Sequence, residues 1–264
     1  MCRLLAIMSD TAITAQQALG DEQLAEFTAL SDFHNDGWGA AWTGTDGRIE
    51  SCSSIIEAEK DPQFEQLTHH NAATEQLIHL RWASEGMATV AENSHPFVRD
   101  GYAFMHNGNI AAPQLIDPML DDEAHALVRG GTDSERFFAY ILQCCRQTGD
   151  TEAGIIKAVE DTKKAFPHRS LNSLILHDGK VYVINVHAGA EFNVDDDPYR
   201  REHLPWQHNE QHYHELVMRR DAHTIIVAST GIQNGDYETL PEGSIFVLSR
   251  EQGVPAIRTL WEGR

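Results

Sequence analysis

A series of short, apolar, β-prone runs bounded by Gly, Asp or Asn is the feature that most restricts the fold of this chain. The Asp178-Gly179 dipeptide joins two of these runs and is typical of a tight antiparallel hairpin. Helical patterns lie in blocks between the runs, which favours α+β layers over a doubly wound parallel sheet. The strands are expected at residues 2–8, 39–42, 77–82, 102–105, 173–176, 181–186, 224–227 and 244–248.

Two helices are expected in the middle of the sequence. Thr132 and Glu135 form a capping-box pattern. An apolar stripe at helical spacing follows, made of Phe137, Phe138, Ile141, Leu142 and Cys145. A second helix is expected after Thr151, with inward-facing Ile155, Ile156 and Val159. Because the sequence contains no repeat, low-complexity tract or linker, we predict a single domain over residues 1–264.

The charge balance and the apolar content limit the partners of the chain. Lys and Arg number 20 against 40 Asp and Glu, a formal net charge of −20, which repels phosphate backbones and argues against nucleic acid. No apolar run approaches the ~20 residues that a membrane-spanning helix needs. The N-terminal apolar stretch is also too short for a secretory signal, so the predicted compartment is the cytoplasm. Adjacent Cys144 and Cys145 and two isolated cysteines form no disulfide framework.

Cys2 is the first candidate for chemistry, because removal of Met1 would place its thiol beside a free α-amine. An α-amine has a pKa of ~7.7–8.0 and a thiol one of ~8.5, so one residue could supply both base and nucleophile. The same position is also typical of a small core residue at the start of a strand.

A second candidate follows the run at residues 102–105, which ends in His106-Asn107-Gly108-Asn109. The Asn107 carboxamide and the Gly108 backbone N–H are neutral donors that could converge on a carbonyl oxygen and stabilise an oxyanion. Asn-Gly is also a common turn sequence, so the pattern alone leaves both interpretations open.

Charged residues near these candidates could recognise a substrate. Arg81 lies in an apolar strand, where its guanidinium needs a salt-bridge partner or a substrate carboxylate, with Trp82 beside it. Asp133 could hold an ammonium group or simply favour the start of the helix. His95 precedes a proline and lies either in a positioning loop or in a tight bend.

Taken together, these motifs resemble the class II glutamine amidotransferases in order and approximate spacing. The family belongs to the N-terminal-nucleophile (Ntn) hydrolases, so the resemblance implies a four-layer αββα sandwich of two antiparallel sheets. The specific motifs cover roughly the first half of the chain. They are Met1-Cys2-Arg3-Leu4, Asp36-Gly37-Trp38-Gly39, His79-Leu80-Arg81-Trp82-Ala83-Ser84, Asn93-Ser94-His95-Pro96-Phe97, His106-Asn107-Gly108-Asn109 and Gly131-Thr132-Asp133-Ser134-Glu135.

The resemblance also implies a role for each matching residue. Cys2 would be the nucleophile that attacks the γ-carboxamide, and Asn107 and Gly108 would form the oxyanion hole. Arg81 would bind the α-carboxylate of glutamine and Asp133 its α-ammonium. Trp82 and Ser84 would line the pocket, and Trp38 and His95 would support it. Ser84 and Glu85 depart from the glucosamine-synthase branch, which has Thr and His at these positions.

The implied reaction forms a γ-glutamyl thioester on the cysteine and needs no metal or organic cofactor. Three functions remain open. The chain is a stand-alone amidohydrolase of glutamine or a γ-glutamyl compound, an ammonia-supplying subunit for a separate partner enzyme, or a non-catalytic γ-glutamyl-binding regulatory module. Self-association into a homo-oligomer is compatible with each.

Two polar segments contain residue types that can bind metal ions. His208, His212 and His214, with nearby glutamates, offer zinc-ligand chemistry, but a solvated polar stretch is favoured because no apolar pattern supports them. Asp195-Asp196-Asp197 does not match the spacing of a twelve-residue calcium loop and is interpreted as an exposed acidic turn. We therefore predict no metal site.

Overall fold

The computed structural model describes residues 2–83, 87–190, 212–232 and 234–263. Its first strand, β1 (Arg3–Ile13), shows how the layers arise. Successive side chains of a strand point to opposite faces. Leu4 and Ala6 accordingly pack into a core between two sheets, whereas Leu5 and Ile7 pack into a second core beneath helices. Because both faces of the first part of β1 are buried, residues 4–8 form a continuous apolar run.

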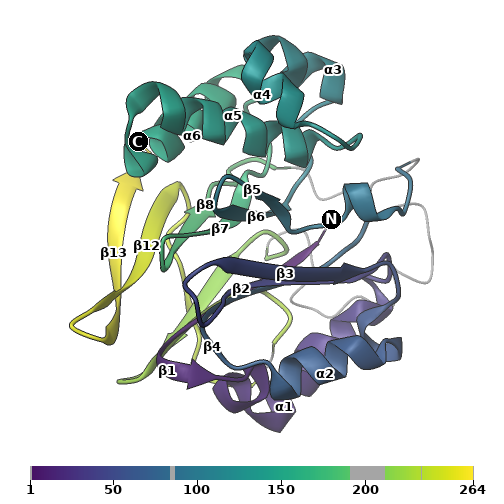
Figure 1. Ribbon diagram of the computed structural model, residues 1–264, viewed down its shortest axis with the longest axis vertical. Coiled ribbons are helices and arrows are strands. Elements are labelled where there is room, and N and C mark those ends of the chain that lie inside the picture. The colour runs from purple at the N-terminus through teal and green to yellow at the C-terminus, as the bar shows by residue number, and fades with distance from the viewer. Residues whose placement is uncertain (1, 84–86, 191–211, 233, 264) are drawn as a thin grey trace.

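Two antiparallel sheets form the centre of the described structure (Figure 1). The seven-stranded sheet has the order β11 (Glu238–Thr239), β9 (Leu216–Arg220), β10 (Thr224–Ser229), β1, β4 (Ala73–Leu80), β2 (Trp38–Thr43) and β3 (Ile49–Ser54). The six-stranded sheet has the order β13 (Val254–Glu262), β12 (Ser244–Glu251), β8 (Lys180–Asn185), β7 (Asn172–His177), β6 (Tyr102–Asn107) and β5 (Phe97–Arg99). The strand paired on each side of β1 runs antiparallel to it.

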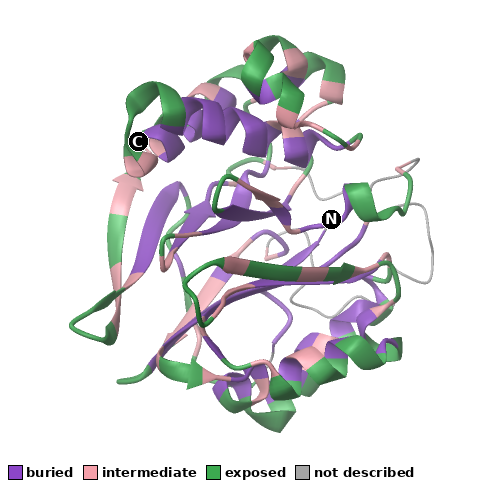
Figure 2. Ribbon diagram, viewed as in Figure 1, coloured by how far each residue is buried: buried purple, intermediate pink, exposed green. Residues whose placement is uncertain are grey.

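Helices cover the outer face of each sheet (Figure 1). The outer core of the seven-stranded sheet includes residues of α1 (Ala15–Ala29) and α2 (Pro62–His70). The helices on the other side are α3 (Pro113–Ile116), α4 (Asp122–Leu127), α5 (Asp133–Thr148) and α6 (Thr151–Ala165). Short 3₁₀ turns lie at Leu30–Asp32, Ala58–Lys60, Ala91–Asn93 and Asp117–Met119. Buried residues concentrate on the strands and the sheet-facing sides of the helices (Figure 2). These layers confirm the predicted α+β sandwich of two antiparallel sheets.

The expected hairpin and helices are present. Asp178 and Gly179 have φ of 48° and 65°, the left-handed values that a tight hairpin turn between β7 and β8 requires. Thr132 caps α5 by accepting a hydrogen bond from the Glu135 backbone N–H. The second half of the predicted capping box, in which the Glu135 side chain would accept from the Thr132 backbone N–H, is wrong. The Glu135 carboxylate instead accepts from the backbone N–H groups of Arg129 and Gly130.

Each predicted strand overlaps an observed one. The structure adds β3, β5, β9, β11 and β13, and it adds α1 to α4, none of which the sequence patterns predicted. Among the described residues, no helix has both the length and the apolar content to cross a bilayer.

Candidate active site

The start of β1 and the end of β6 bring Cys2 and Asn107 together, although 105 positions separate them in the sequence. The Cys2 backbone nitrogen donates a hydrogen bond to Asn107 Oδ1 at 2.8 Å. That bond fixes the amide orientation and leaves the Asn107 Nδ2 group as a donor. Nδ2 is buried and has no hydrogen-bond partner in the described part of the chain. Because buried donors are almost always paired, this one is available for a bound acceptor atom.

Neighbouring residues hold the Asn107-Gly108 segment rigidly. The Ser170 hydroxyl donates to the Asn107 carbonyl at 2.7 Å, and Asn107 pairs with Asn172 across β6 and β7. A Cβ atom at position 108 would lie within 3.0 Å of the Ser170 carbonyl oxygen, so this close approach requires glycine. The end of β6 therefore places the Asn107 side-chain amide next to the Gly108 backbone, which no side chain covers at that position.

The Cys2 thiol is buried and electrostatically activated. It is 8% exposed and donates to the Trp82 carbonyl oxygen at 3.7 Å. Burial raises the pKa of the thiol, but His79, the N-terminal charge and the Trp82 carbonyl together lower it to about 6. A thiol with this pKa is largely thiolate at neutral pH, and the thiolate is the nucleophilic form. No motif in the sequence indicates this effect of His79 on the thiol.

Arg3 anchors the cysteine backbone. Its guanidinium is fully buried and donates from Nε to the Cys2 carbonyl at 2.7 Å. Nη1 reaches the Tyr213 and Thr230 carbonyls at 3.2 and 3.1 Å, and the guanidinium stacks on the Tyr213 ring. These bonds link the start of the chain to the segment before β9 and the segment after β10. The sequence around Arg3 does not indicate this connection.

Arg81 is buried without an acidic partner among the described residues. Its side chain is 3% exposed and donates to the carbonyls of Ala88 at 3.2 Å and Asp36 at 3.5 Å. No carboxylate lies within ion-pair distance of it in residues 2–83, 87–190, 212–232 and 234–263. A guanidinium taken out of water without a counter-ion is costly, which makes the position suitable for a bound carboxylate.

Asp36 fixes the segment that carries Arg81. Its carboxylate accepts from the Ala83 backbone N–H at 2.8 Å, and its backbone N–H donates to the Arg81 carbonyl at 3.1 Å. The Arg81 N–H in turn donates to the Gly37 carbonyl at 2.9 Å. The Asp36-Gly37 motif was visible in the sequence, but its function as a clamp on the Arg81 backbone was not.

Asp133 lies at the start of α5 and is 7% exposed. Its Oδ2 accepts from the Ile110 N–H at 2.6 Å and its Oδ1 from the Ser134 N–H at 2.9 Å. The carboxylate therefore links α5 to the residues just after Gly108. Asp133 thus lies in the first turn of the helix and also holds the Ile110 backbone. Both carboxylate oxygens retain lone pairs that could accept a hydrogen bond from a further donor.

The remaining predicted site residues occupy different places. Trp38 lies on the outer face of its sheet, where its Nε1 donates to Asp61 Oδ2 at 3.0 Å. Trp82 is buried, and its ring packs edge-on against His34 at 5.4 Å. The His95 ring centroid lies 4.4 Å from that of His79. Ser84 falls outside the described residues.

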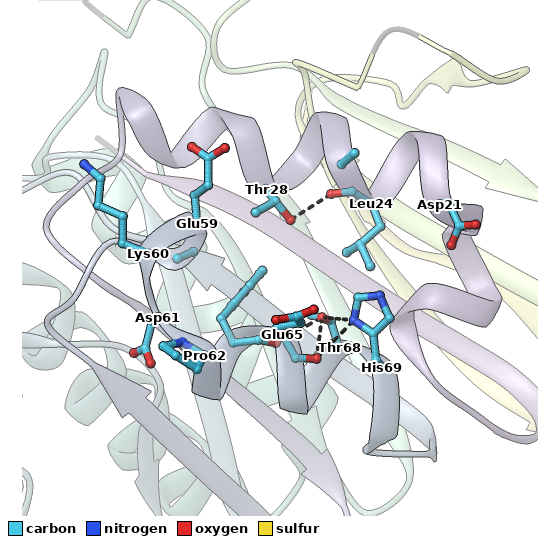
Figure 3. A pocket seen from close by; sticks show the side chains of 13 residues that line it. Asp21, Leu24, Thr28, Glu59, Lys60, Asp61, Pro62, Glu65, Thr68 and His69 are labelled. Carbon is cyan, nitrogen blue, oxygen red and sulfur yellow. Dashed lines mark hydrogen bonds between the residues drawn. The ribbon is translucent and has the colours of Figure 1, made fainter.

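A cavity of about 400 Å³ lies between α1 and α2, on the outer side of the seven-stranded sheet (Figure 3). Leu24 and Phe64 supply apolar lining, and Asp21, Glu59 and Glu65 supply carboxylates. Its lining includes none of the predicted catalytic or substrate-binding residues, so it is separate from the candidate active site.

The two polar segments with metal-binding residue types lie partly outside the described residues. His208 and Asp195-Asp196-Asp197 lie there, whereas the His212 ring is hydrogen-bonded to Glu215 at 3.0 Å. His214 is buried. Within the described ranges, no group of three or more Cys, His, Asp or Glu side chains is arranged to hold a metal ion.

The family follows from a comparison with known proteins. Residues 1–260 match the family model described as glutamine amidotransferases class-II, so the chain belongs to this family. A curated relative, an amidophosphoribosyltransferase of Schizosaccharomyces pombe, is 29% identical over 169 residues. That match covers 61% of this chain but only 30% of the yeast protein.

Solved structures share the fold. A glutamine aminotransferase class-II domain protein from Silicibacter pomeroyi has a TM-score of 0.65 at 19% identity, covering 98% of this chain and 99% of that one. A glutamine phosphoribosylpyrophosphate amidotransferase from B. subtilis, complexed with ADP and GMP, has a TM-score of 0.63 at 14% identity. That comparison covers 99% of this chain and 50% of the bacterial one. At these identities the likeness concerns the fold alone.

Proposed function

We propose that this class II glutamine amidotransferase hydrolyses the γ-amide of glutamine or of a γ-glutamyl compound at Cys2, after removal of Met1. The observation that carries the proposal is the Asn107 amide, which holds the Cys2 nitrogen through Oδ1 and leaves a buried Nδ2 donor that has no partner among the described residues. The low pKa of the adjacent thiol, about 6, supports nucleophilic attack at neutral pH.

The reaction proceeds in two halves. The Cys2 thiolate attacks the γ-carbonyl carbon, and the oxygen of the tetrahedral intermediate accepts hydrogen bonds from Asn107 Nδ2 and the Gly108 N–H. The C–N bond breaks, the leaving nitrogen takes the proton that the Cys2 thiol gave up to its own α-amine, and ammonia departs from a γ-glutamyl thioester. Water then attacks the thioester, releases the γ-carboxylate and regenerates the thiol.

Substrate recognition uses the charges around this centre. Arg81 binds the α-carboxylate, which supplies the counter-ion that its buried guanidinium lacks among the described residues. Asp133 binds the α-ammonium, while Trp82 and Ser84 line the pocket. Trp38 and His95 support the surrounding layers.

The test is turnover without an added acceptor. The purified chain should begin at Cys2 by intact mass, release ammonia and glutamate from glutamine, and gain one adduct on Cys2 from a glutamine-mimicking diazo-ketone. Cys2→Ala should abolish adduct and turnover. Cys52→Ala is the matched control and should retain both, because burial, with the charge of Asp61, raises the pKa of the Cys52 thiol to about 11.

Other outcomes separate the alternatives. Adduct formation with negligible free ammonia would favour transfer to a separate partner enzyme. Glutamine binding with neither adduct nor ammonia would contradict the proposal and favour a non-catalytic binding module.

A further inference from the structure

The Asn93 side chain joins two segments that are far apart in the sequence. It lies at the end of the 3₁₀ turn Ala91–Asn93 and is 7% exposed. Its Nδ2 group donates to the Ala88 carbonyl at 3.1 Å, and its Oδ1 accepts from the Gly131 backbone N–H at 2.9 Å. Because a carbonyl can only accept and an N–H can only donate, these two partners fix the orientation of the amide. We call this pair of hydrogen bonds the Asn93 bridge.

The Ala88 end of the bridge leads to Arg81. The Arg81 Nη2 group donates to the same Ala88 carbonyl at 3.2 Å. A carbonyl oxygen has two lone pairs, so it can accept from Asn93 and Arg81 together. The guanidinium has five N–H donors, so donors remain for a substrate carboxylate when the backbone contacts are made. The position of the Ala88 carbonyl therefore helps to set the direction in which this guanidinium points.

The Gly131 end of the bridge leads to Asp133. Gly131 directly precedes Thr132, which caps α5, and Asp133 is the first residue of that helix. The Glu135 carboxylate accepts from the backbone N–H groups of the two residues before Gly131, at 3.1 and 2.6 Å. The segment that contacts Asn93 is thus tied to the same helix turn that carries Asp133, and the two move as one unit.

Gly130 allows the two segments to lie this close together. A Cβ atom at this position would lie 2.7 Å from both the Glu92 carbonyl oxygen and Asn93 Oδ1. The Glu92 oxygen belongs to the backbone and cannot move aside as a flexible side chain could, so the contact requires glycine. The bridge therefore depends on a glycine in one segment and on a short amide side chain in the other.

We propose that Asn93 is a positioning residue that sets the separation of Arg81 and Asp133, and thereby selects ligands that carry a carboxylate and an ammonium group on one carbon. This inference rests on the proposed function, in which these two residues bind the head group of glutamine. Asn93 acts on them indirectly, through the Ala88 carbonyl and through Gly131. A head group with both charges needs both partners at the correct separation, whereas a ligand with one charge can shift toward its single partner.

Protection of Cys2 from alkylation measures this selectivity without turnover. The processed full-length chain is treated with iodoacetamide, modification of Cys2 is quantified by peptide mass, and the Kd of a ligand is obtained from the slowing of the rate. The ligands are L-glutamate, glutarate, which lacks the ammonium group, and 4-aminobutyrate, which lacks the α-carboxylate. Asn93→Ala should raise the Kd of L-glutamate by about tenfold and the other two by less than about threefold. The alkylation rate without ligand should not change, because the bridge does not involve the thiol.

Ser94→Ala is the matched control. Ser94 is the buried neighbour of Asn93, and its hydroxyl donates to the Val90 carbonyl at 3.1 Å within the same loop. Its removal loosens this loop without deleting either hydrogen bond of the bridge, so all three Kd values should remain at the wild-type level. If Ser94→Ala raised the Kd of L-glutamate as much as Asn93→Ala does, loosening of the loop would explain the effect and the inference would be overturned.

Asn93→Asp keeps the size of the side chain and tests the Ala88 end separately. It retains an acceptor for the Gly131 N–H, but it replaces the Nδ2 donor with an oxygen that repels the Ala88 carbonyl and attracts Arg81 away from a ligand. The Kd values of L-glutamate and glutarate should rise, whereas that of 4-aminobutyrate should not. This variant decides the matter if Asn93→Ala does not fold. Equal rises for all three ligands in either variant would overturn the inference.

The Asn93 bridge and the proposed hydrolysis can fail separately. Ammonia release by the wild type with an unchanged Kd of L-glutamate in Asn93→Ala would refute the role of the bridge and leave the amidohydrolase function standing. A selective loss of L-glutamate binding in a protein that releases no ammonia would do the reverse. Absence of protection by L-glutamate in the wild type would overturn the inference together with the head-group roles of Arg81 and Asp133.

Discussion

The Asn107 side chain uses its two ends for different purposes. Oδ1 holds the Cys2 nitrogen at 2.8 Å, while the buried Nδ2 points to a position with no acceptor in the described structure. An amide that is already fixed loses little freedom when the oxyanion forms, so its stabilisation is specific to the transition state.

Replacing Asn107 with Ala should therefore reduce kcat by about 10²–10³-fold, the cost of one oxyanion donor. KM should change much less, because the donor acts mainly after attack. Asn109→Ala is the control, since Asn109 is an exposed neighbour in the same motif. Steady-state ammonia release measures both constants, and full turnover in Asn107→Ala would contradict the oxyanion assignment.

Arg81 is expected to act on binding instead. Its planar guanidinium can hold a carboxylate through two hydrogen bonds, which Lys cannot reproduce. Arg81→Lys should raise KM for glutamine by about tenfold or more, in line with the ~1.5–3 kcal/mol of a hydrogen bond to a charged group. Arg48→Lys is the control, because Arg48 is exposed and paired with Asp46. An unchanged KM in Arg81→Lys would contradict the proposal that Arg81 binds the α-carboxylate of the substrate.

At the scale of elements, α5 and α6 pack so closely that a glycine is needed. A Cβ atom at Gly154 would lie within 3.0 Å of the Cys145 backbone, which cannot move aside as a flexible side chain could. Gly154→Ala gains up to about 1 kcal/mol of helix propensity but incurs about 1–3 kcal/mol of overpacking. The net expectation is a lower free energy of unfolding, measured by urea denaturation. Ala153→Ser on the exposed side of α6 should change it little, and a stabilised Gly154→Ala would show that the helices can separate without cost.

The sequence predicts elements well where both faces are buried. β10 is buried along its whole length, and residues 225–228 within it form an unbroken apolar run. β13 mixes exposed and half-buried positions without regular alternation and contains a proline, so its own sequence does not predict the strand that pairs with β12. α1 was missed because Gly20, with φ of 78°, interrupts its helical geometry and divides its pattern.

The site was predictable only in part, for a related reason. Cys2, Arg81, Asn107 and Asp133 are visible because their motifs stand at the ends of strands or the start of a helix. Arg3 and His79 were missed as functional residues because their roles depend on partners from distant segments. The Arg3–Thr230 bond, for example, spans 227 positions. Local patterns carry no information on such pairs.

At the scale of the whole molecule, two buried histidines and the half-buried His187 couple the free energy of unfolding to pH. Burial lowers the pKa of His95, His106 and His187 below the usual value near 6.5. In the unfolded chain these rings take up protons at higher pH than in the folded state, so their contribution to stability is complete above pH 6.5 and is lost as pH falls below it.

The free energy of unfolding should therefore decrease steeply between pH 7 and pH 5, by about 1.4 kcal/mol for each pKa unit of depression per ring. Urea denaturation across this range measures the slope. His95→Phe should flatten it, because the phenyl ring packs against the same neighbours without a proton site. His177→Phe, at a ring that stacks on Tyr102 away from the site, should leave the slope unchanged. Since each of these rings acts through proton uptake by the unfolded chain, a wild-type slope of zero over this range would contradict the lowered pKa of the three histidines.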